Sequence, residues 1–354
     1  MHYIYTAWTP TTYLPVPLLK PTNIKSELPT AKFQIPTRNN SHEYNIDGDE
    51  DEGNSGLVKY ALPSHVKSIT STSNPFVKHC LKLRQNSSYR HSHGSALVVG
   101  TTPIREIYNF ETSLQKKTIR MDCLLLLDKA EVPEGLDDIS SHIVRINSMV
   151  MKKLSGVQSS ESIEAIALMK IPTSFLNIDG NQKEADCRSW FPSMHRILVL
   201  DGIQDPGNLG SLLRSAMAFK WGGVFLLPGC CDPFNEKALR ASRGACFQLP
   251  IVSGSWYYLE ALKDEFQMKL LAGHPESREE LRPVSQLSQE LVNSLADVPL
   301  CLVLGSEGHG LSEKSERVCE LVSIPMAGEF ESLNVSVAGG IFLYMLQPKN
   351  HRFI

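Results

Sequence analysis

Long apolar segments and a strong net charge are both missing from this sequence. It has no run of about 18 or more apolar residues, so we expect no helix that spans a membrane. The formal net charge of the 354 residues is -3 at pH 7. A nucleic-acid partner would therefore need a local basic patch, because the chain as a whole supplies no positive field. The hydrophobic content of 42% is enough for the cores of two domains.

Standard motifs for metals and nucleotides are absent as well. The eight cysteines include the adjacent pair Cys230 and Cys231 but no CxxC spacing. We therefore expect no metal site, and free buried thiols in a reducing compartment. No GxGxxG follows the strand predicted at 196–201, and no Walker lysine follows a glycine loop. These absences argue against a Rossmann oxidoreductase and against a P-loop enzyme.

Acidic residues are missing from the first 26 positions. This segment is rich in Thr and Pro, and Lys20 and Lys25 are its only strong cations. An acid-poor, hydroxyl-rich leader is typical of an organelle transit peptide, and the lack of early arginines favours the chloroplast over the mitochondrion. A plain disordered tail is the alternative. The acidic run at 47–52 repels itself, so we assign residues 1–63 to a leader and a linker.

Residues 64–172 are predicted to form a small α/β domain. Hydroxyl and amide side chains at 68–74, followed by Pro75, predict the start of a helix that continues to residue 84. Apolar runs predict strands at 96–99, 121–127, 143–146 and 163–169. No set of acid, base and nucleophile converges here, so we interpret the domain as a binding module. Residues 173–193 are interpreted as a connector.

Basic side chains are interleaved with Tyr and His between residues 78 and 93. This composition suits a phosphate backbone with exposed bases, as in RNA. A solvated helix face without a ligand is the alternative interpretation. The predicted RNA-binding residues are Asn74, Lys78, Lys82, Arg84 and Arg90.

Strands and helices alternate through residues 194–354, which predicts a parallel α/β sheet. Strands are predicted at 196–201, 223–227, 245–249, 269–273, 299–304 and 321–324. Helices are predicted at 209–219, 234–242, 257–266 and 279–295.

Two of these strands end in loops that favour ligand binding. The strand at 299–304 is followed by a loop from Gly305 to Gly310, in which glycines permit a close approach of the backbone to a ligand. The strand at 321–324 ends at Pro325, and a last helix begins near Ser332. Strand ends beside a helix N-terminus form a crevice suited to a small polar ligand.

Three sequence blocks resemble the signature of the SpoU (TrmH-type) RNA 2′-O-ribose methyltransferases of the SPOUT superfamily. They are DGIQDPGNLGSLLR at 201–214, LVLGSEGHGL at 302–311 and IPMAGEFESLNVS at 324–336. The residues that match the family's polar positions are Asn208, Arg214, Glu307, Ser332 and Asn334. Residues 68–168 resemble, more loosely, the family's ribosomal-protein-L30e-like substrate-binding domain.

The resemblance implies a fold, a cofactor and an assembly. The C-terminal domain is expected to be a SPOUT α/β domain with a deep trefoil knot, one of the few exceptions to unthreaded topology. The expected cofactor is S-adenosylmethionine, and the expected assembly is a homodimer. The residues expected to bind the cofactor are Leu304, Gly305, Ile324, Pro325, Met326, Leu333, Asn334 and Ser336.

The expected catalytic residues are Arg214, Asn208, Glu307, Ser332 and Asn334. The family's arginine is proposed to act as a general base, but a guanidinium with a pKa above about 12 resists that role. We favour stabilisation of the developing alkoxide by Arg214, with base action left open. Asn208 is expected to orient Arg214 or the ribose, and Glu307 is expected to hold Asn208 or Arg214 in place. The alternative for Ser332 and Asn334 is that they only cap the last helix and take no part in catalysis.

The sequence therefore predicts an S-adenosylmethionine-dependent RNA 2′-O-methyltransferase that acts on a guanosine of organellar ribosomal RNA. A transfer-RNA methyltransferase is the nearest enzymatic alternative. A catalytically silent RNA-binding factor for ribosome assembly is the alternative from another class.

Overall fold

The computed structural model describes residues 62, 66–113, 120–136, 142–157, 163–178, 186–275, 283–328 and 332–348. The leader and the acidic run predicted within residues 1–52 lie outside these ranges. Both sheets of the structure belong to one unit, residues 56–354. None of the helices in the described part of the chain has the length and apolar character needed to cross a membrane.

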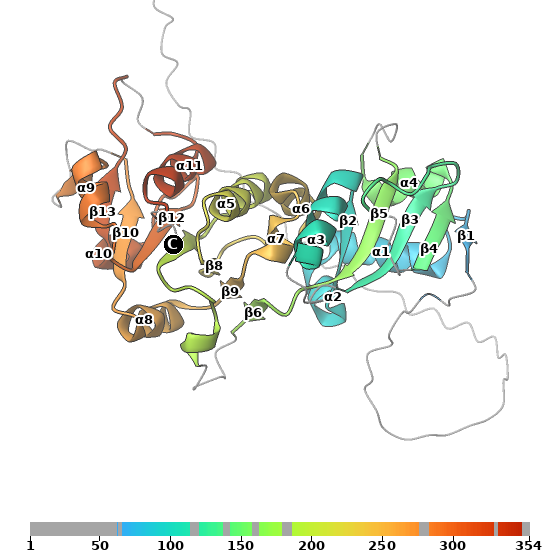
Figure 1. Cartoon of the computed structure of the whole chain (residues 1–354), viewed down its shortest axis with the longest axis horizontal. Coiled ribbons are helices and arrows are strands. Elements are labelled where there is room, and N and C mark those ends of the chain that lie inside the picture. The colour runs from blue at the N-terminus through green and yellow to red at the C-terminus, as the bar shows by residue number, and fades with distance from the viewer. Residues whose placement is uncertain are drawn as a thin grey trace, which may run out of the picture. The chain divides into compact units, whose positions relative to one another are not determined.

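The first sheet has five strands in the order β1-β4-β3-β5-β2 (Figure 1). Its strands are β1 (Ser68–Ile69), β2 (Ser95–Val99), β3 (Met121–Leu127), β4 (His142–Ile146) and β5 (Ala165–Lys170). β1, β4 and β3 run parallel, whereas β5 is antiparallel to β3 and to β2. Its helices are α1 (Pro75–Gln85), α2 (Ser87–His93), α3 (Thr101–Ser113) and α4 (Ser148–Ser155).

Local capping explains where α1 and α2 begin and end. The side chain of Asn74 accepts a hydrogen bond of 2.8 Å from the amide of Phe76, and Pro75 occupies the first turn. Asn86 ends α1 and caps α2 by accepting a bond of 2.8 Å from the amide of Tyr89. Gly94, with φ of 56°, then ends α2 in the left-handed region. The helix start predicted at Pro75 is confirmed.

The second sheet has eight strands in the order β11-β13-β10-β12-β7-β8-β9-β6, and every pair is parallel. The strands are β6 (Phe175–Asn177), β7 (Arg196–Asp201), β8 (Gly223–Leu226), β9 (Ile251–Ser253), β10 (Lys269–Gly273), β11 (Val284–Gln286), β12 (Leu300–Gly305) and β13 (Glu320–Ser323). The parallel α/β class predicted for residues 194–354 is confirmed.

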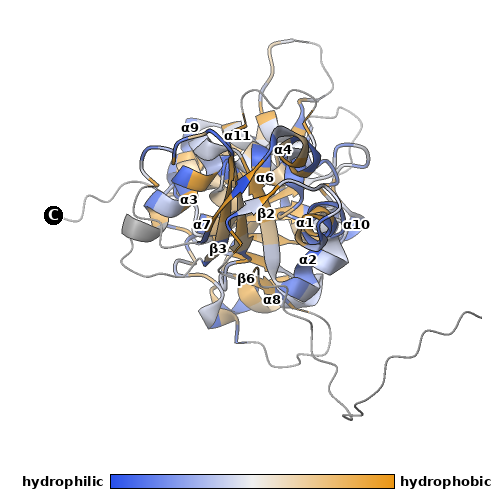
Figure 2. Cartoon of the chain, turned by 90° about the vertical axis from the view of Figure 1, so that its right-hand side faces the viewer, coloured by the Kyte–Doolittle hydropathy of each residue, from blue (hydrophilic) through white to orange (hydrophobic). Residues whose placement is uncertain are grey.

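The central strands carry a different apolar cluster on each face, as alternation of side chains requires. Leu198 and Leu200 of β7 pack with α5 (Pro206–Ala218) and α11 (Val335–Met345). Ile197 and Val199 face the other way and pack with α8 (Trp256–Glu265). Figure 2 shows hydrophobic strands in the interior of the chain and hydrophilic residues on the outer helices and loops. The remaining helices are η1 (Cys187–Ser189), α6 (Glu236–Ser242), α7 (Ala245–Gln248), α9 (Gln289–Ser294) and α10 (Glu313–Val318).

Three element predictions were wrong. The connector predicted at 173–193 contains β6, which adds an edge strand beside β9. The strand predicted at 245–249 is the short helix α7, since brief apolar runs do not separate helix from strand. The helix predicted at 279–295 is β11 followed by α9 within its described part. The eight cysteines are free, and six of them are buried, as predicted.

Candidate active site

Polar groups gather where the parallel strands of the second sheet end. In the middle of the sheet, Gly305 at the end of β12 pairs with Asp201 at the end of β7. β10 ends beside them at Gly273. α5 begins after β7, where the Asp205 side chain accepts a bond of 2.8 Å from the Asn208 amide. Strand ends and a helix start therefore converge at one edge of the sheet, where ligands of α/β proteins bind.

The glycine loop after β12 is a tight turn. The amide of Ser306 donates to Gly310 O at 2.7 Å, and the amide of Gly310 donates back at 3.0 Å. A Cβ on Gly305 would lie 2.3 Å from the Gly310 carbonyl, so only glycine fits there. The turn leaves Glu307 and His309 exposed.

A hydrogen-bond network joins all three sequence blocks. Asn208 Nδ2 donates to Glu307 Oε1 at 2.8 Å, and Asn208 Oδ1 accepts from Asn334 Nδ2 at 3.2 Å. Asn334 Oδ1 in turn accepts from the amide of Ser336 at 2.9 Å and from its hydroxyl at 2.6 Å. Asn334 is thus the N-cap of α11 as well as a member of the network. Each amide group has both a donor and an acceptor role, which fixes its orientation.

Asp201 holds the start of α10, which follows the glycine loop. It is buried, and its Oδ2 accepts from the Ser312 amide at 2.9 Å and from the Ser315 hydroxyl. These bonds tie the start of α10 to the end of β7. Sequence reasoning did not single out this role, although a carboxylate at the end of a buried strand needs partners.

A cavity of about 630 Å³ opens beside the network. Predicted residues that line it are Leu304, Gly305, Glu307, Ile324, Met326, Ser332, Leu333 and Asn334. Pro325 and Ser336 are not among its lining residues, and Ser336 reaches the site only through Asn334. Sequence reasoning missed Gly273, His274, Glu316, Ala338 and Phe342, which also line it. The strand predicted at 269–273 carried a signal for Gly273, because its carboxyl end lies beside that of β12.

The lining of the cavity combines apolar side chains with carboxylates. Leu304, Ala338 and Phe342 supply apolar surface, whereas Glu307 and Glu316 are its carboxylates. No Lys or Arg is among the described residues that line it. The volume and the mixed polar and apolar lining suit a small cofactor, and the two carboxylates favour a cation over an anion.

Arg214 lies apart from this network. It is exposed on α5 and is not among the residues that line the cavity. Its guanidinium makes no hydrogen bond or ion pair with the described part of the chain. The structure therefore brings Asn208, Glu307 and Asn334 together, and it leaves Arg214 directed to solvent in the single chain.

Two of the predicted RNA-binding residues are corrected by the structure. Arg90 is only 2% exposed and pairs with Asp232, with 2.6 Å between Nη2 and Oδ2. Arg84 is largely buried, with 12% of its side chain exposed, and pairs with Glu236 at 3.0 Å. Both arginines pair with carboxylates that follow β8, Asp232 in a loop and Glu236 in α6, which the local sequence pattern did not indicate. Arg90 is therefore a structural residue and not an RNA contact.

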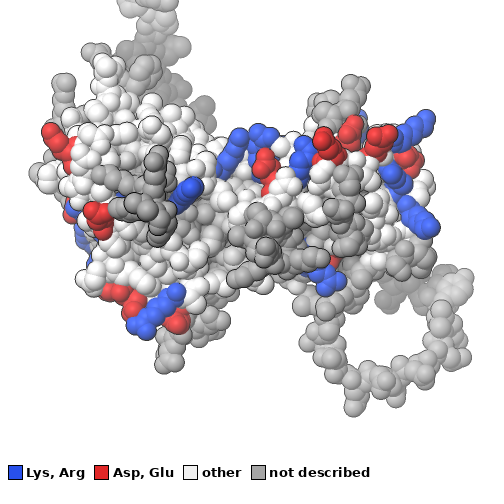
Figure 3. Space-filling view, in the orientation of Figure 1, with Lys and Arg blue, Asp and Glu red and all other residues white. Residues whose placement is uncertain are grey.

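The other predicted RNA-binding residues keep an exposed basic face on α1. Lys78 and Lys82 are exposed, and Lys82 Nζ lies 5.6 Å from the centre of the Tyr89 ring. Asn74 serves as the cap of α1. On the face drawn in Figure 3, basic and acidic side chains are interspersed, which agrees with the absence of a global positive field.

The fold and the cavity define a parallel α/β protein with a cofactor-sized site at the carboxyl edge of its sheet. The model of the SpoU rRNA Methylase family matches residues 195–344. An uncharacterized tRNA/rRNA methyltransferase of Synechocystis sp. is 31% identical over 290 residues, which cover 80% of this chain and 95% of that protein. The chain belongs to the SpoU rRNA methylase family.

Further relatives agree with this membership. The 23S rRNA (guanosine(2553)-2′-O)-methyltransferase RlmP of Bacillus subtilis is 26% identical, and the match covers 80% of this chain and all of RlmP. The crystal structure of an RNA 2′-O ribose methyltransferase is 26% identical with a TM-score of 0.60, covering 79% of this chain and 97% of that one. The SpoU methyltransferase AviRb of Streptomyces viridochromogenes, in complex with AdoMet, shares the fold at 22% identity and a TM-score of 0.60, covering 77% of this chain and 97% of that one.

Proposed function

We propose that this chain is an S-adenosylmethionine-dependent RNA 2′-O-ribose methyltransferase. Membership of the family makes it an RNA methyltransferase. The network of Glu307, Asn208 and Asn334 at the rim of a cofactor-sized cavity is the observation that carries the proposal. Transfer to the ribose 2′-oxygen is supported by the names of RlmP and of the 26% identical solved structure.

The residues of the cavity fit S-adenosylmethionine. Bound there, this cofactor supplies an electrophilic methyl group on a positively charged sulfur. Leu304, Gly305, Ile324, Met326 and Leu333 would hold its adenosine through backbone groups and apolar contacts. The lack of a Lys or Arg among the described lining residues avoids repulsion of the sulfonium, and Glu307 and Glu316 favour it.

The chain's own residues would orient and stabilise the ribose hydroxyl. Asn208 is held by Glu307 and Asn334, so its amide is a fixed group for the incoming ribose. Ser332 is exposed at the cavity and is available to a ribose hydroxyl. Arg214 would stabilise the negative charge that develops on the 2′-oxygen, because a guanidinium stays protonated.

We propose a homodimer in which Arg214 acts in the site of the second copy. Support comes from an apolar stripe on α11 formed by Val337, Gly340 and Tyr344, whose spacing places them on one helix face, with Leu333 just before the helix. Leu333, Val337 and Tyr344 are 38%, 52% and 57% exposed. A Cβ on Gly340 would meet nothing within 4 Å, so a second backbone has room to approach there. The position of Arg214 outside its own cavity is consistent with this assembly.

The trefoil knot and the domain roles are part of the same proposal. The entry to α11 lies against Asn208 of α5, as a segment threaded beside the glycine loop would. The five-stranded unit would be the L30e-like substrate-binding domain, with Lys78 and Lys82 contacting RNA phosphates.

We propose a chloroplast location, with the mitochondrion as the alternative, on the composition of residues 1–26. A fluorescent fusion to residues 1–62 tests the location.

A guanosine of organellar ribosomal RNA is the proposed substrate, supported by the substrate that the name of RlmP states. Transfer RNA is the second candidate, because the Synechocystis relative is named for both RNA classes. Purified chain with methyl-labelled S-adenosylmethionine and separate pools of ribosomal and transfer RNA distinguishes them. Label in ribosomal RNA alone supports the proposal. Label in neither pool, with cofactor binding intact, would instead identify a silent RNA-binding factor.

A further inference from the structure

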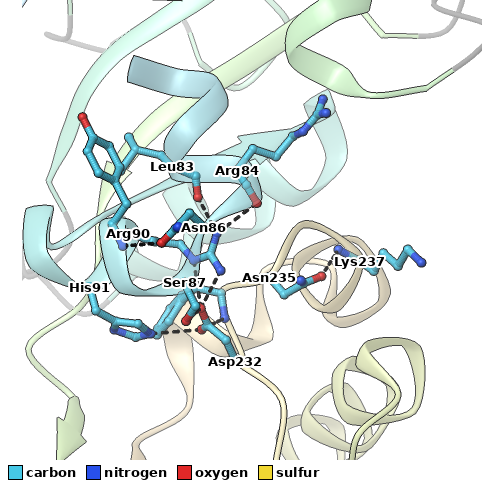
Figure 4. Close-up of polar contacts among 11 residues, drawn as sticks. Leu83, Arg84, Asn86, Ser87, Arg90, His91, Asp232, Asn235 and Lys237 are labelled. Carbon is cyan, nitrogen blue, oxygen red and sulfur yellow. Dashed lines mark hydrogen bonds and ion pairs between the residues drawn. The ribbon is translucent and has the colours of Figure 1, made fainter. Parts of the chain in front are cut away.

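Arg90 is a buried cation whose donors are divided between α1 and the other domain. Its Nη1 donates to Leu83 O and, at 3.0 Å, to Arg84 O. These are carbonyls at the end of α1, where a cation is favoured by the helix dipole. Its Nε and Nη2 donate to Asp232 Oδ2 at 2.9 and 2.6 Å (Figure 4). A buried guanidinium needs this full set of partners, because an unpaired buried charge is costly.

Asp232 receives bonds from three residues of α2. Besides Arg90, the Ser87 hydroxyl donates to its Oδ2 at 2.7 Å, and His91 Nε2 lies 3.3 Å from its Oδ1. Oδ1 also accepts from the Phe234 amide at 2.8 Å, within its own loop. Figure 4 shows Ser87, Arg90 and His91 converging on this one carboxylate. Burial alone would raise the pKa of Asp232, but the bond from His91 and the charge of Arg90 lower it well below its ordinary value.

The contacts around this carboxylate extend the connection between the two domains. The His91 ring lies 5.4 Å from the ring of Phe175 and 6.3 Å from that of Phe234, measured between centroids. Arg84 adds its ion pair with Glu236 at the start of α6. Ile104 and Ile107 of α3 share one apolar cluster with Phe247 of α7 and with α5. The two domains are therefore joined by a continuous set of polar and apolar contacts.

α6, which begins with Glu236, connects these contacts to α5, the helix that carries Asn208 and Arg214. A Cβ on Gly210 of α5 would lie 2.5 Å from Ala238 O and 2.9 Å from the Ser242 amide. The backbones of α5 and α6 thus meet directly, which leaves little freedom for one to move against the other. Asn208 and Arg214 lie on the same α5. Lys78 and Lys82 lie on α1, whose end Arg90 holds.

We propose that Arg90 and Asp232 are positioning residues, which hold the lysine face of α1 at a fixed distance from α5. RNA bound through Lys78 and Lys82 then presents its ribose at the Asn208 site, whereas cofactor binding is independent of the pair. This inference rests on the proposed function for its catalytic readout. A rigid connection between the RNA contact and the reacting group contributes to RNA affinity, because the two surfaces that bind one RNA are already held in their relative positions.

The test is Asp232→Asn in the full chain. The amide keeps the shape and can still accept from Phe234, but its nitrogen cannot accept from Arg90 or Ser87. We expect the KM for RNA to rise at least about tenfold, with kcat at saturating RNA within about twofold, since pre-organised RNA binding is lost and the reacting groups are unchanged. The affinity for S-adenosylmethionine should be unchanged. Glu265→Gln is the matched control, because the pair of Glu265 with Arg188 lies within the second sheet's domain.

Hydrogen exchange gives a readout that does not depend on activity. Amides of α2 and of residues 230–236 should exchange faster in Asp232→Asn, and those of β7 and β12 should not. If Asp232→Asn does not fold, Glu236→Gln removes the weaker Arg84 pair and should shift the KM for RNA in the same direction. Unchanged KM and unchanged exchange at α2 would overturn the proposal, as would loss of cofactor affinity. If even the unaltered chain fails to methylate RNA, the proposed function fails and the exchange at α2 alone decides the docking role.

Discussion

Asn208 is the residue on which the three sequence blocks meet. Its side chain donates to Glu307 and accepts from Asn334, although these residues are 99 and 126 positions away along the chain. The resemblance to a family predicted that these residues belong to one site, and the fold supplies the reason. Parallel strands bring their carboxyl ends to one edge, so loops distant in sequence meet there.

Arg214→Ala should separate catalysis from cofactor binding. Because Arg214 lies outside the cavity of its own chain, the affinity for S-adenosylmethionine should not change. The kcat for methyl transfer should fall by about 10²- to 10³-fold, the usual loss when a charge-stabilising donor is removed. Calorimetry and a single-turnover assay measure the two effects. Arg188→Ala is the control, and turnover of Arg214→Ala equal to that of the unaltered chain would exclude Arg214 from the reaction.

His79 predicts a pH dependence of stability. It is 5% exposed, and burial, then the charges of His93, Lys170 and Lys82, lower its pKa from 6.5 to about 4. The unfolded chain therefore takes up this proton first as the pH falls. The free energy of unfolding that the neutral ring contributes is fully present above about pH 6.5 and is lost as the pH falls to about 4. Between pH 7.5 and pH 5 this one group should cost about 2 kcal/mol.

Denaturant unfolding at the two pH values measures this loss. The variant His79→Gln has no ring to titrate, so the difference between pH 7.5 and pH 5 should shrink by most of that amount. An equal difference in both chains would show that His79 does not control the pH dependence.

At the scale of elements, α11 uses its two adjacent glycines differently. A Cβ on Gly339 would lie 2.3 Å from Leu212 Cδ2 and 2.8 Å from Leu304 Cδ1, whereas one on Gly340 would meet nothing within 4 Å. Gly339 thus permits α11 to pack closely on α5 and β12. Gly340 lies on the apolar stripe proposed for the dimer.

Gly339→Ala and Gly340→Ala are a matched pair in one helix. Gly339→Ala should destabilise the fold by about 1–2 kcal/mol, since overpacking exceeds the gain in helix propensity. Gly340→Ala gains the propensity without a clash and should be neutral or stabilising by up to about 1 kcal/mol. The free energy of unfolding in denaturant measures both. Equal stability of the two variants would contradict the close packing of Gly339 against Leu212 and Leu304.

The sequence predicted elements best where a strong apolar run coincided with a clear stop. β7 and β10 were predicted at 196–201 and 269–273, because each is a continuous buried run with polar or glycine ends. α7 was mistaken for a strand, since its four residues are too few to show a period. β6 was missed because its stability comes from pairing with β9, a partner that local sequence does not reveal.

The site, like the elements, was predicted only in part from the sequence. Family positions identified the network, but Asp201, Glu316 and Phe342 were missed because tertiary packing alone brings them to it. Arg90 was predicted as an RNA contact on its charge and position near Tyr89. Its burial against Asp232 depends on a loop 142 residues away, which no local pattern indicates.

At the scale of the whole molecule, the exposed stripe on α11 is the feature that the single chain leaves unexplained. Val337→Glu should convert a dimer to a monomer, because a charge in the middle of an apolar interface is costly to desolvate. Sedimentation analysis measures the mass. Met149→Glu is the control, since Met149 is 65% exposed on α4 of the other sheet. A chain that is monomeric before substitution would contradict the dimer.

The most direct measurement of the central claim is the chemical position of the transferred methyl group. RNA treated with the purified chain and S-adenosylmethionine is digested to nucleosides and analysed by mass spectrometry. We expect a methyl group on the ribose of guanosine, formed at least about 10²-fold more slowly by the Arg214→Ala chain. A methyl group on a base, or no methylated nucleoside while the cofactor still binds, would contradict the account.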